Sequence, residues 1–487
     1  MVPGRIQFDC NDQGEHTHFK MSKGSVLPQY IAGLSASFGA LCMGASIGWS
    51  SPVEEKLYSG EEYDFVVTSS QFGWVSSLLT LGATVICIPI GFAIDWIGRR
   101  PTMLALFPPY MVGWLLMIFA SNVTMLYFGR FILGMCGGAF CVTAPMYCTE
   151  ISTTSLRGTI GSFFQLLIVS GVLFGYLLGA FLDLMPINIV CAILPIIFVT
   201  VHFFMPESPV YLALKGRNDD AAKSLQWLRG AGADIDEELK EILEESQRQN
   251  DQEKVNILAA LRRPIVLKGL GISVLLQVFQ QCTGINAILF YSASIFQDVG
   301  ASLEGKYASI IIGVTQVVST LVAVVIIDKA GRRILLIISG LLMAITTALL
   351  GLYFFLSEQS PGSMDNFGWL PIASICIFIV FFSIGFGPVP WLVMAELFSE
   401  DVKSVAGSIS GTSNWLSAFI VTLLFPILKE SIGPGPTFWI FTGVAVVSFF
   451  YSIFCVPETK GKTILEIQHI LSGGKVKHVE DDEGKKI

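Results

Sequence analysis

The chain has 487 residues, of which 53% are hydrophobic and only 14% are charged, and its formal net charge is −8. A soluble enzyme of this length would carry far more charge, so the composition indicates a membrane protein with many spans. The sequence contains no basic patch with interleaved aromatic residues, which argues against a nucleic-acid partner. Its ten cysteines form neither a CxxC pair nor a cluster with histidine, so neither a metal site nor a cofactor is predicted.

Apolar segments long enough to cross a bilayer, at roughly 20 residues each, recur along the chain. Residues 1–27 form a polar N-terminal tail, and the first six spans are predicted within residues 28–205. A charged stretch with helical periodicity at 206–264 predicts short amphipathic helices in a cytosolic linker. Six more spans are predicted within residues 265–456, followed by a C-terminal tail at 457–487. The predicted fold is an all-α membrane protein with twelve transmembrane helices.

Lysine and arginine gather in the loops on one side of these spans, together with the linker and the tails. The opposite loops are short or acidic, as at Glu54 and Glu55. Because cytosolic loops carry the excess of positive charge, both termini are predicted to lie in the cytosol. The plasma membrane is the expected location of this multi-pass protein.

Three charged motifs occur twice in the same order, once in each set of six spans. The pairs are DxxGRR at 95–100 and 328–333, Glu150 with Arg157 and Glu396 with Lys403 at identical spacing, and PES at 206–208 with PET at 457–459. Two six-helix pseudo-repeats in parallel, with a substrate site between them, are typical of secondary transporters. The repeat therefore predicts a transporter built from two halves.

The most polar stretch within the apolar segments begins at Gln277 and reads QVFQQCTGINAILFYS. On a helix, Gln277, Gln280, Gln281 and Gly284 share one face, whereas Asn286 would point to the opposite side. Either Asn286 faces a different neighbour, or the helix breaks near Gly284 and turns Asn286 toward the glutamines. Buried amides need hydrogen-bond partners, since hydrocarbon offers none. A cavity lined by uncharged amides favours a neutral solute that is rich in hydroxyl groups.

Together these motifs resemble the sugar porter family of the major facilitator superfamily, over about residues 28–465. The motifs are the DxxGRR pair, the E-x6-R/K pair, PESP, QQ-x2-GINA-x3-YS, GPVPW and PETKGK. The chain looks most like animal facilitative sugar carriers, particularly the insect trehalose-transporter-like group. The resemblance implies a sugar transporter that acts in the lipid bilayer by a rocking of its two halves. We expect a monomer to be sufficient.

The resemblance also implies which side chains contact the sugar. These are Gln165, Gln280, Gln281, Asn286, Gln316, Trp391 and Asn414. Relatives often carry asparagine where this chain has Gln316, which affects the expected size of the pocket. For Gln277 an interhelical hydrogen bond is the better explanation, and Phe290 and Tyr291 are equally compatible with a gate and with packing.

The repeated charges at the cytosolic helix ends have two explanations. They are either surface pairs worth about 0–1 kcal/mol each, or a network that joins the halves when the cytosolic side is closed. The matched spacing favours the network. Its members are Asp95, Arg99, Arg100, Glu150, Arg157, Glu207, Asp328, Arg332, Arg333, Glu396, Lys403 and Glu458. Family members typically have arginine where this chain has Lys403, and lysine cannot form a planar bidentate pair, which predicts weaker closure in the second half.

Proton-driven sugar porters carry a titratable aspartate in the first span, roughly where this chain has Ser46. Arg130 in the fourth span is the one obvious charge inside the spans, and it either snorkels outward or meets backbone carbonyls. His202 is a weak candidate for binding a proton. We therefore expect a facilitative uniporter for a hexose or for trehalose. A proton-coupled sugar symporter and a non-transporting sugar sensor are the alternatives, and no motif in the spans indicates an enzyme.

Overall fold

The computed structural model describes residues 25–60, 62–251, 260–298, 304–327, 329–360 and 364–472. Within these residues every regular element is a helix, and twelve helical segments are long and apolar enough to cross a membrane. The predicted all-α fold with twelve spans is therefore confirmed. Asp328, residues 1–24 of the N-terminal tail and residues 473–487 of the C-terminal tail lie outside the described residues.

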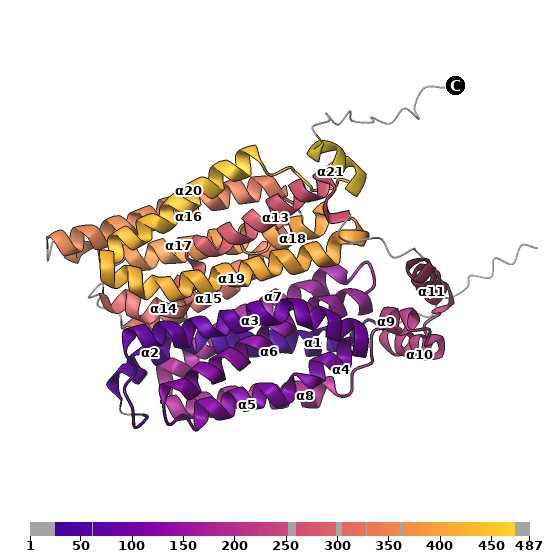
Figure 1. Cartoon of the computed structure of the whole chain (residues 1–487), viewed down its shortest axis with the longest axis horizontal. Coiled ribbons are helices and arrows are strands. Elements are labelled where there is room, and N and C mark those ends of the chain that lie inside the picture. Colours follow the sequence, from indigo (N-terminus) through magenta and orange to yellow (C-terminus); the bar gives the residue numbers. More distant parts are fainter. Residues whose placement is uncertain are drawn as a thin grey trace, which may run out of the picture.

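The first six spans form one half, drawn from indigo to magenta in Figure 1. Its helices are α1 (Leu27–Gly48), α2 (Ser50–Ser59), α3 (Ser69–Ile97), α4 (Arg99–Ala105), α5 (Phe107–Ile118), α6 (Val123–Ile151), α7 (Arg157–Phe181) and α8 (Leu184–His202). The first span consists of α1 and α2, and the third consists of α4 and α5. The Thr68 side chain caps the start of α3 in a capping box, and the Asn122 side chain caps the start of α6. Each accepts a hydrogen bond from a backbone N–H that has no partner within the helix.

Small residues let the helices of this half approach closely. A Cβ built on Gly44 of α1 would lie 2.0 Å from the carbonyl oxygen of Ile168 in α7. Likewise, a Cβ on Gly134 of α6 would lie 1.9 Å from the carbonyl oxygen of Leu79 in α3. Such contacts are typical of membrane helices, which associate by close packing where no water is present to drive burial.

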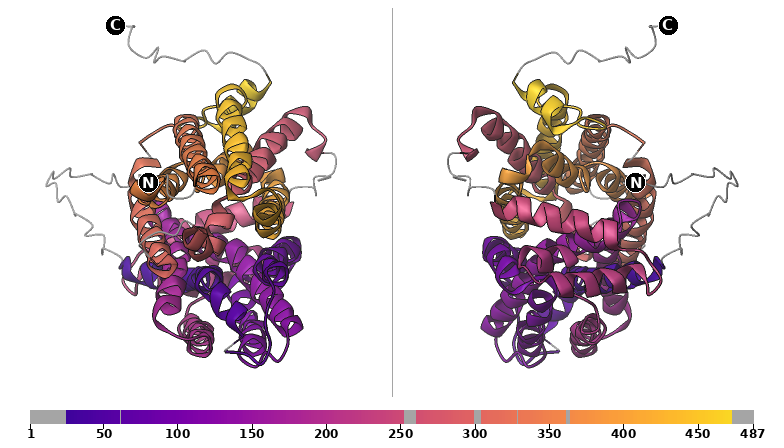
Figure 2. Two further views of the ribbon diagram at one scale, coloured as in Figure 1. Left: turned by 90° about the vertical axis from the view of Figure 1, so that its left-hand side faces the viewer. Right: turned by 90° about the vertical axis from the view of Figure 1, so that its right-hand side faces the viewer.

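The second half contains the other six spans, drawn from pink to yellow in Figure 1. Its helices are α13 (Pro264–Cys282), α14 (Ile285–Asp298), α15 (Gly305–Ile327), α16 (Arg332–Gln359), α17 (Leu370–Ile384), α18 (Val389–Leu397), α19 (Glu400–Ile432) and α20 (Pro434–Phe454). The seventh span combines α13 with α14, and the tenth combines α17 with α18. Figure 2 looks along the bundle and shows this half stacked on the first.

The described part of the linker contains three short helices: α9 (Pro209–Leu214), α10 (Asn218–Arg229) and α11 (Asp236–Asp251). They lie beyond one end of the bundle, and α21 (Ile464–Leu471) lies at the same end (Figure 1). We call this the linker end and the opposite one the far end. Arg229 of α10 donates to the Ile151 carbonyl at 2.9 Å and pairs with Glu238 of α11 at 2.6 Å, which attaches the linker to the first half.

Candidate functional site

The seventh span breaks at the glycine that the sequence singled out. α13 ends at Cys282, α14 begins at Ile285, and Gly284 between them has φ +94°. Glycine adopts this left-handed conformation at no steric cost, and a Cβ at this position would lie 2.6 Å from the Phe441 ring. The break turns Asn286 back, so that its amide donates to Gln281 Oε1 at 2.7 Å. The second of the two alternatives for Asn286 is the observed one.

Five amides from α13, α14 and α19 form one hydrogen-bonded group, which we call the amide cluster. Gln281 Nε2 donates to Asn414 Oδ1 at 3.0 Å. Asn414 Nδ2 donates to Gln277 Oε1 at 2.8 Å and to Gln280 Oε1 at 2.5 Å. All five side chains, Asn286 included, belong to residues that are at most 8% exposed. The interhelical bond expected of Gln277 is present, while Gln277 Nε2 is buried with no partner among the described residues.

Gln280 connects this cluster to the second broken span of the same half. Its Nε2 donates to the carbonyls of Phe386 at 2.7 Å and Gly387 at 2.5 Å. Both carbonyls lie in the interruption between α17 and α18, where the sequence places prolines next to glycines. A helix break leaves carbonyls without an intrahelical partner, and in a membrane another group must satisfy them. Gln280 therefore stabilises the break, and its Oε1 accepts from Asn414.

The three other predicted contact residues form no hydrogen bond with this cluster in the described part of the chain. Gln316 of α15 is buried, and its Oε1 has no hydrogen-bond partner in the described part of the chain. Gln165 of α7 is half-buried, the only member of the predicted set from the first half. Trp391 of α18 is also half-buried, and its ring edge lies 3.8 Å from a Cβ built on Gly411, one turn before Asn414 in α19.

At the far end three serines join the two halves, and we call them the hydroxyl cluster. Ser51 of α2 lies 2.7 Å from Ser292 of α14 and 3.2 Å from Ser309 of α15, oxygen to oxygen. Ser292 and Ser309 are 2.8 Å apart, and the Ala293 amide donates to Ser51 at 2.9 Å. The three serines are at most 1% exposed. Ser292 ends the motif QQ-x2-GINA-x3-YS, but no pattern in the sequence links it to Ser51 or Ser309. Lone serines in apolar helices commonly bond their own backbone.

Further far-end contacts join the halves beside this cluster. Tyr176 of α7 donates to the Leu289 carbonyl of α14 at 2.6 Å. Tyr291 has φ −124° and ψ 19°, which interrupts α14, and its hydroxyl donates to the Thr422 carbonyl at 3.0 Å. Its ring meets Phe72 of α3 edge-on, with 5.9 Å between centroids. Tyr291 thus contacts both halves. Its neighbour Phe290, the other predicted gate residue, is fully buried. A gating role for these two residues stays a prediction.

The linker end repeats the same arrangement of charges in each half. In the first half Arg99 donates to Glu150 through Nε at 2.9 Å and Nη2 at 2.8 Å. In the second half Arg332 donates to Glu396 through Nε at 3.2 Å and Nη2 at 3.0 Å. Asp95 lies 3.8 Å from Arg99, with its side chain 76% exposed. The internal repeat seen in the sequence is thus reproduced in the hydrogen bonds.

A second carboxylate in each half caps the helix that begins at the arginine pair. Glu207 accepts from the backbone N–H groups of Arg99 and Arg100, each at 3.2 Å. Glu458 accepts in the same way from residues 332 and 333, at 2.9 and 3.2 Å. Burial raises the pKa of the Glu207 carboxyl above its ordinary value, and the amide donors with Arg99 oppose this shift. These bonds fix each loop to its own half.

The linker end differs from the far end in the contacts that join the two halves. Among the described residues we find no ion pair that joins the halves at the linker end. Arg157 is exposed at the start of α7 and forms no ion pair within the same residues. A Cβ built on Gly158 or Gly161 of α7 would meet nothing within 4 Å. The predicted network between the halves therefore stays a prediction, since the pairs observed lie inside each half.

Comparison with known proteins identifies the family. The sequence model of the family described as Sugar (and other) transporter matches residues 23–471. The chain belongs to this family. Its members are transporters and not enzymes, and the sugar porter resemblance is thereby confirmed.

Insect proteins are among the similar relatives. A protein from Apis mellifera ligustica named facilitated trehalose transporter Tret1 is 37% identical, over 95% of this chain and 92% of its own length. A Culex quinquefasciatus protein of the same name is 36% identical, over 91% and 86%. Some relatives are longer, since the chain spans 49% of the Drosophila virilis protein. The solved structure of the Escherichia coli xylose transporter XylE, partially occluded and inward open, has a TM-score of 0.75 at 24% identity, covering 89% of this chain and 99% of that one.

In this sugar transporter the buried arginine of the fourth span forms no ion pair within the described residues. Arg130 is fully buried and donates to the carbonyls of Ser46 at 2.6 Å and Val75 at 3.1 Å. It also donates to Ser50 Oγ at 2.6 Å, and its guanidinium lies 4.9 Å from the centre of the Trp49 ring. Of the two possibilities for this side chain, contact with carbonyls is observed. These oxygen dipoles and the ring stabilise the charge at the junction of α1 and α2.

His202 lies buried at the linker end of α8, away from the amide cluster. Its Nδ1 is 3.0 Å from Ser35 Oγ, and its ring stacks on Phe198 with 5.2 Å between centroids. Tyr147 closes the other side of the ring edge-on. These neighbours are neutral, which suits a packed imidazole better than a group that exchanges protons with the cavity.

Proposed function

We propose that this protein is a facilitative sugar transporter that carries a neutral hexose or trehalose by alternating access. The observation that carries the proposal is the amide cluster, which is buried at the breaks of two spans. Amide groups offer both donors and acceptors, matching the alternating hydroxyls of a pyranose ring. The insect relatives named facilitated trehalose transporters make trehalose the first sugar to test.

The cluster suits transient binding of a sugar. Its amides bond to one another, so a sugar must replace those bonds with its own. Each hydrogen bond exchanged in this way contributes only about 1 kcal/mol net. Binding is therefore weak and release rapid, as a carrier requires. Trp391 would face the C–H side of the sugar, and Gln165 and Gln316 would complete the site from α7 and α15.

The direction of opening follows from the two ends of the bundle. By the positive-inside rule, the basic residues of the linker end favour a cytosolic location for this end. The plasma membrane is the proposed location of the protein. The hydroxyl cluster and Tyr291 close the far end, which faces outside. The structure described is then the state that opens toward the cytosol, and the opposite state requires these far-end contacts to separate.

Transport without proton coupling follows from the surroundings of Arg130. Proton coupling requires a side chain that titrates near neutral pH. Proton-driven sugar porters have an aspartate for this in the first span, where this chain has Ser46. The Ser46 hydroxyl donates to the Cys42 carbonyl at 3.0 Å. The partners of Arg130 are carbonyls, a hydroxyl and an indole ring, which do not titrate in this range. A proton-coupled symporter is the alternative, and alkalinisation of the medium on addition of sugar would decide for it.

The proposal is tested by uptake of radiolabelled glucose, fructose and trehalose in oocytes. We expect saturable uptake of at least one of the three, and a loss of roughly ten-fold or more in Gln281→Leu. Leucine leaves the Asn286 amide nitrogen without its acceptor and Asn414 Oδ1 without its donor. Gln247 is exposed in α11, so the variant Gln247→Leu is the matched control and should transport sugar normally. Full uptake by Gln281→Leu at equal surface expression would remove the amide cluster from the mechanism.

A further inference from the structure

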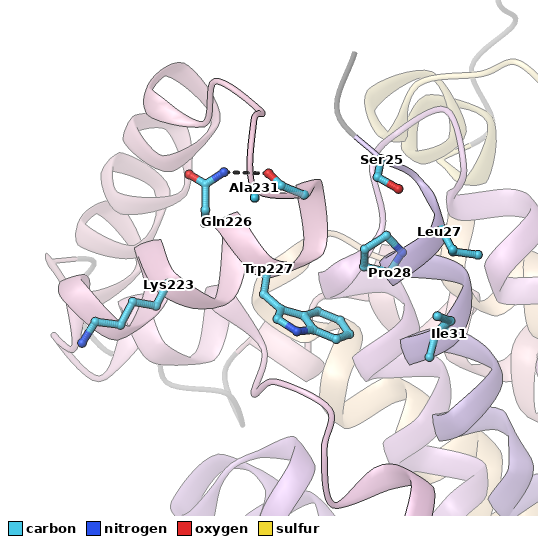
Figure 3. A pocket seen from close by; sticks show the side chains of 9 residues that line it. Ser25, Leu27, Pro28, Ile31, Lys223, Gln226, Trp227 and Ala231 are labelled. Carbon is cyan, nitrogen blue, oxygen red and sulfur yellow. Dashed lines mark hydrogen bonds between the residues drawn. The ribbon is translucent and has the colours of Figure 1, made fainter. Parts of the chain in front are cut away.

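A groove lies at the linker end where the start of α1 meets α10 (Figure 3). It has a volume of about 550 Å³. Its lining residues are Ser25, Leu27, Pro28, Ile31, Lys223, Gln226, Trp227, Gly230 and Ala231. Four of them present apolar side chains from α1 and α10, and Lys223 is the single charged residue among the nine.

The apolar wall of this groove continues a lipid-facing surface. Leu27, Ile31 and Leu34 follow one another at helical spacing along α1, and they are 61%, 42% and 44% exposed. Because α1 belongs to the first membrane span, this exposed stripe faces lipid chains. The stripe continues into the groove, because Leu27 and Ile31 belong to both. An acyl chain lying on the stripe therefore ends in the groove.

The opposite wall has the chemistry of a membrane interface. Trp227 is 40% exposed, and its indole faces Pro28 across the groove (Figure 3). Tryptophan is enriched at the level of lipid headgroups, where its ring is apolar and its N–H is polar. Lys223 precedes it by one helical turn, so both side chains lie on one face of α10. In Figure 3 the Lys223 side chain extends away from α1, so its ammonium lies at the outer edge of the groove, 3.6 Å from Asp220. This exposed pair contributes little and leaves the lysine available to a headgroup at that edge.

The groove is held in shape by bonds on its own walls. Gln226 Nε2 donates to the carbonyls of Gly230 at 2.8 Å and Ala233 at 3.2 Å, which fixes the turn after α10. Gly230 has φ +93°, and a Cβ there would lie 3.1 Å from the backbone nitrogen of Ser25. Arg229 bonds to the first half at the Ile151 carbonyl. The linker wall is thus attached to the transmembrane helices.

We propose that this groove binds a membrane phospholipid with an acidic headgroup. One acyl chain lies along Leu27, Ile31 and Leu34, the glycerol region contacts Trp227, and the phosphate and headgroup pair with Lys223. The occupant is a lipid because the groove is continuous with the lipid-facing stripe of α1. This site is separate from the carriage of sugar.

Brominated lipids test the site directly, because bromine quenches tryptophan fluorescence only at short range. The full-length transporter is reconstituted in phosphatidylcholine vesicles that contain a minor fraction of phosphatidylglycerol, with bromine on the chains of one lipid or of the other at equal mole fraction. The difference between the wild type and Trp227→Phe isolates the signal of Trp227. We expect brominated phosphatidylglycerol to quench this signal with roughly five-fold preference, which corresponds to about 1 kcal/mol for one lysine at an acidic lipid.

Two lysine variants separate the groove from general surface charge. Lys223→Glu should abolish the preference for phosphatidylglycerol. Lys240→Glu is the matched control, because Lys240 has a similarly exposed side chain and a weak pair with Glu244 at 3.9 Å on α11, outside the groove, and it should keep the preference. Equal quenching by both lipids in the wild type would overturn the acidic headgroup, and absence of Trp227 quenching would overturn the lipid site.

Native mass spectrometry provides a second measurement that needs no tryptophan variant. The wild type and Lys240→Glu should retain phosphatidylglycerol, and Lys223→Glu should retain less. Equal retention by all three proteins would contradict the proposal. Sugar uptake by the two lysine variants verifies that they fold.

Discussion

The two ends of this transporter hold its helices together with different chemistry. At the far end, neutral hydroxyls and aromatic rings join one half to the other, as in the contact of Ser51 with Ser292 and Ser309. At the linker end, the ion pairs lie inside each half, as in Arg99 with Glu150. Hydrogen bonds between hydroxyls contribute about 1 kcal/mol each and exchange readily with water. The contacts described at the far end therefore join the two halves through individually weak bonds, whereas the ion pairs of the linker end join helices of the same half.

The duplicated arrangement explains why a rocking motion suits this fold. Each half has an arginine paired with a glutamate and a second glutamate that caps the following helix. The same loop is therefore fixed to the same helices in both halves, so each half moves as a unit. The contacts that must change during transport are then those that cross between the halves, where α3 packs on α19 and α7 on α15.

The largest expected effect is the loss of an ion pair inside one half. Glu150→Ala leaves the Arg99 guanidinium, whose side chain is 7% exposed, without its carboxylate. Removing one partner of a buried pair costs about 3–5 kcal/mol, so the melting temperature in detergent should fall sharply. Asp95→Ala removes the exposed partner at 3.8 Å and serves as the control, with little change expected. Equal melting temperatures for the two variants would show that the pairs do not stabilise the half.

Arg157→Ala tests whether the linker end also closes across the halves. Arg157 has no ion pair in the described part of this state, so its substitution should leave folding and surface expression intact. If it pairs with the second half when the cytosolic side closes, uptake should fall several-fold. Uptake equal to the wild type at equal surface expression would refute the network between the halves.

A smaller effect is expected when hydroxyls are removed from the far end. Ser292→Ala combined with Ser309→Ala deletes the hydroxyl bonds to Ser51, roughly 1–2 kcal/mol in total. The far-end-open state should become several-fold more populated. Labelling of Phe290→Cys by a membrane-impermeant thiol reagent from outside measures this shift, since residue 290 is fully buried in the closed state. An unchanged labelling rate would mean that the hydroxyl cluster does not control closure.

The sequence predicted those features that depend on local pattern. A glycine in a polar stripe indicated the break at Gly284, because the alternative left Asn286 on the wrong face. The charged repeat predicted two halves, and each copy makes the same bonds. The hydroxyl cluster was not predictable, because Ser51, Ser292 and Ser309 come from three helices whose relative placement no short motif encodes.

Burial decided the remaining details of the site. The sequence left two possibilities for Arg130, and only the packing of α1, α3 and α6 shows that carbonyls surround it. The amide of Gln280 was expected to face a solute, yet its nitrogen bonds to the carbonyls of Phe386 and Gly387. That partner arises because the seventh and tenth spans break side by side, which the sequence of either span alone does not determine.

The central claim, passive transport of a sugar, is tested most directly by the level that the sugar reaches inside proteoliposomes. Purified transporter is reconstituted, labelled sugar is added outside, and an inward proton gradient is imposed. For a passive transporter the internal sugar concentration should rise to the external one and stop there, with and without the gradient. Accumulation above the external concentration that collapses with a protonophore would contradict it.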